Sequence, residues 1–198
     1  MNQPRGKPVT RVGRPRLINE NLPKGEWTAG INSAEYAALV GQYITALVHV
    51  EEHLAIFFGR LILLPTRSPD VARQSFRAVR FAEGKIKLMR SVLHNSQVHA
   101  EKPSIFDEVI DGYETANGKR NDYAHSLWYT HESGRVFKTR ATTDALRFDE
   151  YNRQEVTVKQ LERDLKYLED LLEKIQHATE WEDPNPIAHG KRRMKIKT

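Results

Sequence analysis

One long amphipathic stretch governs the architecture expected of this chain, and it reads SAEYAALVGQYITALVHVEEHLAIFFGRLI over residues 33–62. Apolar side chains recur in it at alternating spacings of four and three, which is the period of one helix face. These positions are Tyr36, Val40, Tyr43, Leu47, Val50, Leu54, Phe57 and Leu61. Ser33 is a favourable N-cap, and Pro65 ends the pattern. The stretch therefore predicts one helix of about thirty residues.

Shorter helical patterns follow. Ser68-Pro69-Asp70 puts a proline in the favourable first turn of a second helix. A third pattern is either separate from the second or continuous with it near Gly84, and its apolar positions are Phe81, Ile86, Leu88, Met89, Val92 and Leu93. Pro103-Ser104 caps a fourth helix, and a last helix begins at Thr157 or a neighbour and ends before Pro184.

Residues 127–157 interrupt this helical pattern. They combine β-compatible segments with a Glu132-Ser133-Gly134 turn, which favours a small hairpin or an ordered loop. The prediction is an all-α protein, an up-and-down bundle of four to five helices in residues 33–182, with the 127–157 excursion before the last helix.

Positive charge is concentrated in two predicted tails, residues 1–32 and 183–198. The formal net charge is +5, but the first 24 and last 12 residues carry +10, which leaves residues 25–186 at −5. The tails lack apolar periodicity and are predicted to be disordered. Gly13-Arg14-Pro15-Arg16 suits either a DNA minor-groove arm or a solubilising tail, so DNA binding through the tails is one functional alternative.

Composition excludes several functional classes. The chain has no cysteine, which excludes disulfides, a thiol nucleophile and cysteine-ligated metal centres and suits a cytoplasmic location. No run approaches about eighteen apolar residues, so no membrane-spanning helix is expected. Phosphate-binding loops, dinucleotide fingerprints and the serine-hydrolase motif are missing from the sequence, and we expect no cofactor.

The segment most informative about chemistry is Arg120-Asn121-Asp122-Tyr123-Ala124-His125, at the end of the fourth predicted helix. Arg120 lies seven residues after Tyr113 and continues an apolar stripe with a permanent cation, which must reach water, an acid or a bound anion. Asn121 and His125 are four residues apart and share a helix face. Arg120 and His125 point about 140° apart on an ideal helix, so they converge only if the helix bends or a second copy completes the site.

These residue types suit a phosphodiester. The guanidinium can neutralise charge on phosphoryl oxygens, and the imidazole can exchange a proton with the 2′-OH or the leaving 5′-oxygen. The amide can orient the imidazole or bind an oxygen. Because RNA supplies its own nucleophile, this chemistry needs no metal. The alternative is a C-terminal helical turn in which Arg120 and His125 interact with the helix dipole and the last carbonyls.

The motif resembles the Arg-Asn-x3-His signature of the HEPN superfamily, whose members are small helical bundles. Many are metal-independent endoribonucleases of toxin–antitoxin, phage-defence and RNA-processing systems. The resemblance covers residues 33–180, with Glu51-Glu52 on the first helix and Lys85 on a middle helix. It implies that Arg120 and His125 are the catalytic pair.

The resemblance also implies that Asn121 is the polar helper, and Glu51 and Asp122 are auxiliary candidates. Its implied partners are RNA, a second copy of the chain that completes a cleft, and an antitoxin or regulatory protein. Some members bind RNA without cutting it, so a non-catalytic RNA-binding or protein-interaction module is the alternative function. Leu127 departs from a toxin subgroup that has tyrosine two residues after the histidine.

A basic strip is a further candidate RNA-binding surface. Arg73, Arg77 and Arg80 are spaced i, i+4, i+7, and Lys87 follows one heptad later. The strip can follow a phosphate backbone or pair with the acidic last helix, whose acids are Glu162, Glu169, Asp170 and Glu173.

Two other patterns have competing interpretations. His49-Val50-Glu51-Glu52-His53 matches the inverted zincin motif, but His and Glu beside an apolar stripe explain it without a metal, and we expect no metal site. Trp128 and Tyr129 can stack on a base or be buried under the hairpin.

Overall fold

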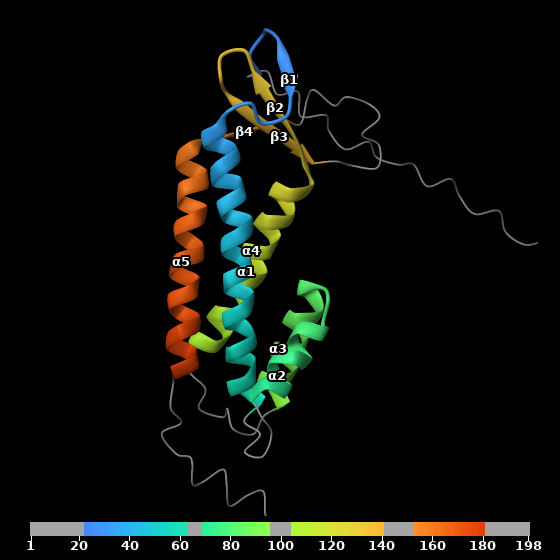
Figure 1. The fold of residues 1–198 in the computed structure, drawn as a ribbon, viewed down its shortest axis with the longest axis vertical. Coiled ribbons are helices and arrows are strands. Elements are labelled where there is room, and N and C mark those ends of the chain that lie inside the picture. The colour runs from blue at the N-terminus through green and yellow to red at the C-terminus, as the bar shows by residue number, and fades with distance from the viewer. Residues whose placement is uncertain (1–21, 63–68, 96–103, 141–152, 181–198) are drawn as a thin grey trace, which may run out of the picture.

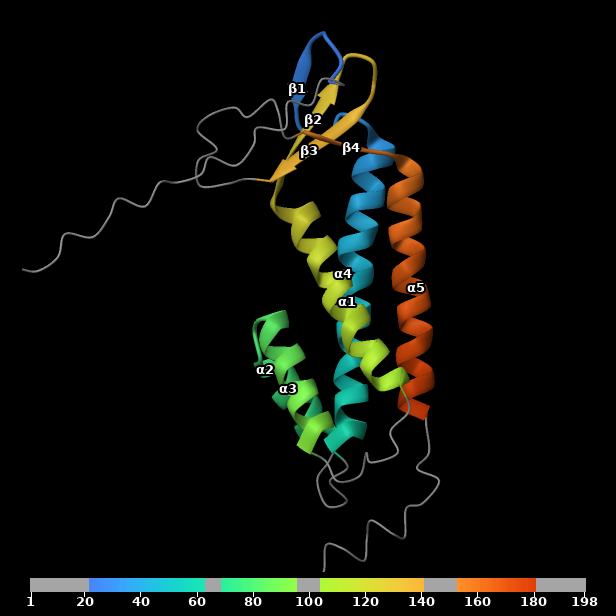
Figure 2. The same cartoon turned by 180° about the vertical axis from the view of Figure 1, so that it is seen from behind.

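The computed structural model describes residues 22–62, 69–95, 104–140 and 153–180. In these ranges the chain forms five helices: α1 (Ala34–Ile62), α2 (Pro69–Ala78), α3 (Ala82–Asn95), α4 (Ile105–His125) and α5 (Val158–Glu180). Helices α1, α4 and α5 pack along the long axis of the molecule, and α2 and α3 lie against the half of α1 that is remote from the sheet (Figures 1 and 2). A small sheet covers the end where α1 and α5 begin and α4 finishes.

The predicted stripe of the first helix is confirmed. Seven of its eight apolar positions are buried, and Tyr36 is half-buried. Tyr43 packs edge-on against Tyr123 at a centroid distance of 5.3 Å, and Phe57 packs against Phe106 at 5.5 Å. These aromatic pairs join α1 to α4 and place α1 at the centre of the core.

Two predicted helix caps have different outcomes. Thr157 Oγ1 accepts a hydrogen bond of 3.2 Å from the Gln160 amide, as an N-cap should. Ser104 makes no side-chain cap and instead directs its hydroxyl to Glu108 Oε1 at 3.4 Å.

Helices α2 and α3 are separate, which settles the alternative left open by the sequence. Helix α2 ends at Ala78, and the first residue of α3 is Ala82. The break therefore lies at residues 79–81 rather than near Gly84. The predicted basic strip is therefore divided, with Arg73 and Arg77 on α2, Arg80 in the break and Lys87 on α3. Phe81, predicted as a core position, is 77% exposed.

The predicted helices and the predicted hairpin of the excursion are confirmed, but the hairpin is part of a four-stranded sheet, so the fold is not a pure all-α bundle. Four strands, β1 (Trp27–Ala29), β2 (Ser126–His131), β3 (Val136–Arg140) and β4 (Gln154–Val156), form an antiparallel sheet in the order β1-β2-β3-β4. The predicted turn is present, because Gly134 has a φ of 81° and its amide bonds to the His131 carbonyl at 2.9 Å.

The sheet also recruits residues from outside the predicted domain. Strand β1 lies within the segment predicted as an N-terminal tail, and Trp27 pairs with His131. Residues 1–21 and 181–198, which hold most of the two predicted basic tails, lie outside the described residues, as do residues 141–152 of the excursion. None of the helices in the described ranges is both long and apolar enough to cross a bilayer.

Candidate functional site

A cleft of about 440 Å³ lies between α1, the start of α3 and the second half of α4. Its polar lining comes from all three regions and consists of Glu51, Arg80, Glu83, Asn117, Arg120 and Asn121. Its apolar wall includes Leu47 and Val48 of α1 and Phe81 beside Arg80. The cleft therefore brings Arg120 and Asn121 of the motif together with Arg80 of the predicted basic strip and with Glu51.

Both carboxylates of the cleft already have partners. Glu51 accepts hydrogen bonds from the Tyr113 hydroxyl at 2.7 Å and from Lys85 Nζ at 2.6 Å. Glu83 accepts one from Lys87 Nζ at 2.6 Å, which lowers the pKa of this exposed carboxyl. Burial raises the pKa of the Tyr113 hydroxyl, and its hydrogen bond to Glu51 raises it further. The tyrosine therefore stays a neutral donor.

The two arginines of the cleft are not neutralised in this way. Arg120 Nη1 donates to Asn121 Oδ1 at 3.0 Å, which holds the guanidinium beside the amide. Within the described parts of the chain, neither Arg80 nor Arg120 forms an ion pair with a carboxylate. Each lining carboxylate is paired with a lysine outside the lining, Lys85 with Glu51 and Lys87 with Glu83, so the charges of the two lining guanidinium groups are not offset by those acids. The cleft therefore suits an anionic group.

His125 lies at a different place from the cleft. It is the exposed last residue of α4, one turn beyond Asn121, and it is not among the lining residues. Because α4 runs as one helix through both residues, Arg120 and His125 point about 140° apart. A single protomer therefore does not bring the predicted catalytic pair together.

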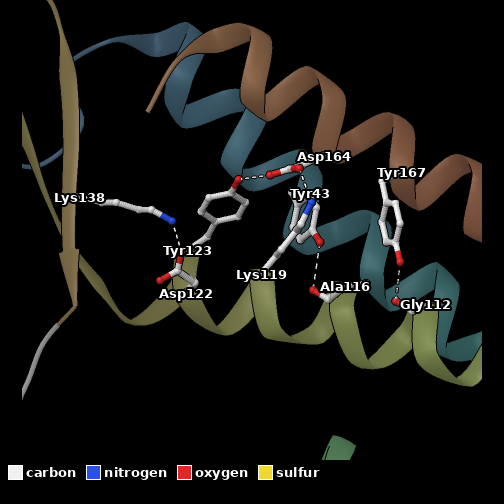
Figure 3. A network of polar contacts seen from close by, with 9 residues as sticks. All are labelled: Tyr43, Gly112, Ala116, Lys119, Asp122, Tyr123, Lys138, Asp164 and Tyr167. Carbon is white, nitrogen blue, oxygen red and sulfur yellow. Dashed lines mark hydrogen bonds and ion pairs between the residues drawn. The ribbon is translucent and has the colours of Figure 1, made fainter. Parts of the chain in front are cut away.

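Asp122, the other auxiliary candidate, is not among the residues that line the cleft. It forms an ion pair with Lys138 of β3, whose side chain is 6% exposed. This contact joins the end of α4 to the sheet (Figure 3). We therefore assign Asp122 a structural contact in this protomer.

A buried polar network fixes the face of α4 that points away from the cleft (Figure 3). Asp164 of α5 is 6% exposed and accepts hydrogen bonds from the Tyr123 hydroxyl and Lys119 Nζ. Tyr43 donates to the Ala116 carbonyl at 3.0 Å, and Tyr167 donates to the Gly112 carbonyl at 3.3 Å. Four hydrogen bonds thus set the rotation of α4 and, with it, the direction of Arg120 and Asn121.

Asp164 was missed by the sequence analysis, although a signal was present. It lies three residues after Leu161 and four before Leu168, on the buried stripe of α5. A carboxylate at such a position requires a buried donor. Burial also raises the pKa of Tyr123, and the hydrogen bond to Asp164 raises it further.

Three of the four residues of the predicted basic strip form ion pairs with nearby carboxylates. Arg77 bonds to Glu52 of α1, and Arg73 lies 4.0 Å from Asp70 of α2. The acids of α5 that were expected as alternative partners include Glu169 and Asp170, which pair with Lys166 of the same helix. Arg80 alone among the four strip residues lines the cleft.

The aromatic residues after the motif are occupied by internal contacts. Trp128 is half-buried and donates its indole N–H to the Tyr123 carbonyl at 3.0 Å. The guanidinium of Arg153 lies 4.4 Å from the ring of Tyr129 and 4.2 Å from that of Trp27. These contacts favour the interpretation of burial over that of base stacking.

The histidines of the zincin-like pattern lie on one face of α1. His53 Nδ1 is 2.9 Å from the His49 carbonyl oxygen, one turn earlier. In the ranges that the structure describes, no three His, Asp or Glu side chains are grouped as metal ligands. Glu51 and Glu52 of this pattern contact Lys85 and Arg77.

No family model, curated protein or solved structure matches this chain. The resemblance to the HEPN superfamily therefore depends on the motif at residues 120–125 and stays a prediction.

Proposed function

We propose that this protein is a metal-independent endoribonuclease that binds an RNA phosphate in the cleft and cleaves through the 2′-OH. The observation that supports it best is the pair of arginines, Arg80 and Arg120. Arg80 lies between α2 and α3 and Arg120 lies on α4, and both line one cleft whose carboxylates are already neutralised. Guanidinium groups are the protein cations best suited to phosphate oxygens.

The proposed reaction transfers protons without a cofactor. His125 accepts the 2′-OH proton as the 2′-oxygen bonds to phosphorus, or it protonates the 5′-oxygen as the P–O5′ bond breaks. Arg120 stabilises the negative charge that grows on the phosphoryl oxygens, and Asn121 holds the guanidinium in place. The products are a 2′,3′-cyclic phosphate and a 5′-OH.

A homodimer is part of the proposal. Since one helix separates Arg120 from His125 by about 140°, the working site takes Arg120 from one copy and His125 from the other. Both residues can reach a ligand. Arg120 is partly exposed and lines the cleft, and His125 is exposed.

The first experiment is incubation of the full chain with RNA in EDTA. We expect wild-type protein to produce 2′,3′-cyclic phosphate ends, His125→Ala to abolish them, and His177→Ala to leave them unchanged. His177 is a matched control because it is an exposed histidine on α5. Equal amounts of intact RNA with wild type and His125→Ala, across single-stranded and structured substrates, would contradict the proposal.

Mixing two inactive variants tests the shared site. A mixture of Arg120→Ala and His125→Ala chains contains heterodimers with one intact composite site. Random pairing should then recover about one quarter of the wild-type activity. A site built within one protomer would recover none.

The second candidate function is RNA binding without cleavage. It is favoured by one observation, the position of His125 outside the cleft. It predicts that RNA affinity is the same for wild type and His125→Ala and falls when Arg80 and Arg120 are replaced by alanine. The salt dependence of binding should then become shallower by about 0.7 in log–log slope for each arginine removed.

A further inference from the structure

Phe81 is the most exposed large apolar side chain in the described part of the chain. It is 77% exposed, whereas Val48, the next, is 58% exposed. It lies at the break between α2 and α3, where its carbonyl accepts the Lys85 amide at 3.1 Å and so begins α3. Val48 lines the same cleft, so the two most exposed large apolar side chains of the described residues lie on one concave surface, as in a binding site.

The neighbours of Phe81 identify the class of ligand. Phe81 lines the same cleft as Arg80 and Arg120, and the two acids of the cleft are paired with lysines, which leaves both guanidinium groups available to an anion. A purely apolar peptide would use only the ring, and an inorganic anion would use only the guanidinium groups. A nucleotide uses both, because its phosphate binds guanidinium groups and its base stacks on an aromatic face.

We propose that Phe81 is a stacking platform for one unpaired base of a single-stranded RNA segment, and that Arg80 binds the phosphate next to that base. This inference deepens the proposed ribonuclease function and rests on it. It makes the cleft selective for single strands, since the bases of a duplex are already stacked and cannot reach the ring. Stacking on a ring tolerates every base, so the platform confers little sequence preference.

Binding of uncleavable RNA tests the platform separately from catalysis. The probes are a short 2′-O-methyl oligonucleotide, which lacks the nucleophilic hydroxyl, and an abasic oligomer with the same number of phosphates. We expect Phe81→Ala to weaken binding of the base-containing probe about tenfold and to leave the abasic probe unchanged. Phe81→Trp should restore the affinity, and Arg80→Ala should weaken both probes.

Matched controls separate stacking from general loss of apolar surface. Val71→Ala removes a side chain that is 45% exposed on α2 and does not line the cleft, so it should change neither affinity. Because Phe81 is exposed, Phe81→Ala should also leave the urea midpoint within error of wild type.

Three results would overturn the inference. The first is equal affinity of wild type and Phe81→Ala for the base-containing probe. The second is an equal loss for both probes, which would make Phe81 a support of the cleft rather than a platform. The third is conversion of a dimer to a monomer by Phe81→Ala in sedimentation with probe discrimination unchanged, which would assign the ring to subunit contact. If His125-dependent cleavage persists in any of these cases, the proposed function stands without the platform.

Discussion

Lys85 Nζ lies 2.6 Å from Glu51 Oε2, and this ion pair joins α3 to α1. Glu51 also lines the cleft. The Lys85 side chain is 10% exposed and that of Glu51 is 34% exposed. The carboxylate thus has two tasks, because it neutralises a nearly buried ammonium and limits the positive charge offered to a ligand.

Glu51→Gln should separate those two tasks. The substitution leaves Lys85 with no counter-charge, and we expect the free energy of unfolding to fall by about 2 kcal/mol. It also removes one negative charge from the cleft, so RNA should bind more tightly at low salt and with a steeper salt dependence. Urea denaturation and fluorescence anisotropy measure the two effects.

Glu162→Gln is the control for this prediction. It changes the net charge equally at an exposed position on α5, away from the lining of the cleft. Stability should be unchanged and RNA affinity should rise far less than in Glu51→Gln. If both variants strengthen RNA binding to the same degree, the effect arises from the charge of the whole protein, and the cleft has no special part in it.

The buried carboxylate of Asp164 should be the most sensitive polar position in the helical bundle. Asp164→Ala leaves Tyr123 and Lys119 without their acceptor, and we expect a loss of about 3 kcal/mol in unfolding free energy. Tyr123→Phe removes one donor and retains the Lys119 pair, so it should cost about 1 kcal/mol. Denaturant unfolding of both variants checks the order, and a larger loss in Tyr123→Phe than in Asp164→Ala would contradict it.

The fold was predictable wherever one period extends over many residues. The stripe from Val40 to Leu61 predicted α1, and Thr157 predicted the start of α5. The sheet was only half predictable, because β1 pairs with β2 from about one hundred residues away in the chain. A three-residue strand such as β1 also carries too little alternation to be distinguished from a loop, whereas β4 overlaps the β-compatible end of the predicted excursion.

The site shows the same division between local and non-local information. Arg120 and Asn121 were identified from an arginine that interrupts an apolar stripe, which is a local signal. Phe81 fitted the apolar period of the third pattern and was predicted to be buried. The interruption between α2 and α3 at residues 79–81 is a matter of how these helices pack against α1, and this packing leaves the Phe81 ring exposed.

Three buried tyrosines should make the protein sensitive to alkali. Burial raises the pKa values of Tyr43, Tyr113 and Tyr123, and nearby carboxylates add to each shift. A folded-state pKa above the unfolded value of about 10 gives stability that is complete below pH 10 and is lost as the pH rises. Each tyrosine should cost about 1.4 kcal/mol per pH unit above that point.

Tyr113→Phe tests this pH dependence. It should lower the stability at pH 8 by about 1 kcal/mol, because Glu51 loses a donor. Above pH 10 its unfolding free energy should fall less steeply than that of wild type, by about 1.4 kcal/mol per pH unit. Urea titrations at pH 8 to 11.5 measure the slope, and parallel curves for the two proteins would show that Tyr113 takes no part in alkaline unfolding.

Two glycines of α4 offer a matched test of how tightly this helix packs on α5. A methyl group on Gly118 would meet no atom within 4 Å, whereas one on Gly112 would lie 2.7 Å from Leu171 Cδ1. Alanine is favoured over glycine inside a helix by about 1 kcal/mol, and the gain is the same at both positions. Gly118→Ala should therefore stabilise the protein by about 0.5 to 1 kcal/mol.

Gly112→Ala should have the opposite sign. Leu171 is 3% exposed, so its side chain has little room to move, and overpacking of this kind costs about 1 to 3 kcal/mol. This cost exceeds the gain in helix propensity, and a net loss of about 1 kcal/mol is expected. Both midpoints can be measured in one thermal-unfolding series. If the two alanine variants are equally stabilised, Leu171 rotates away at no cost, and the contact between α4 and α5 at Gly112 does not fix the rotation of the helix that carries Arg120.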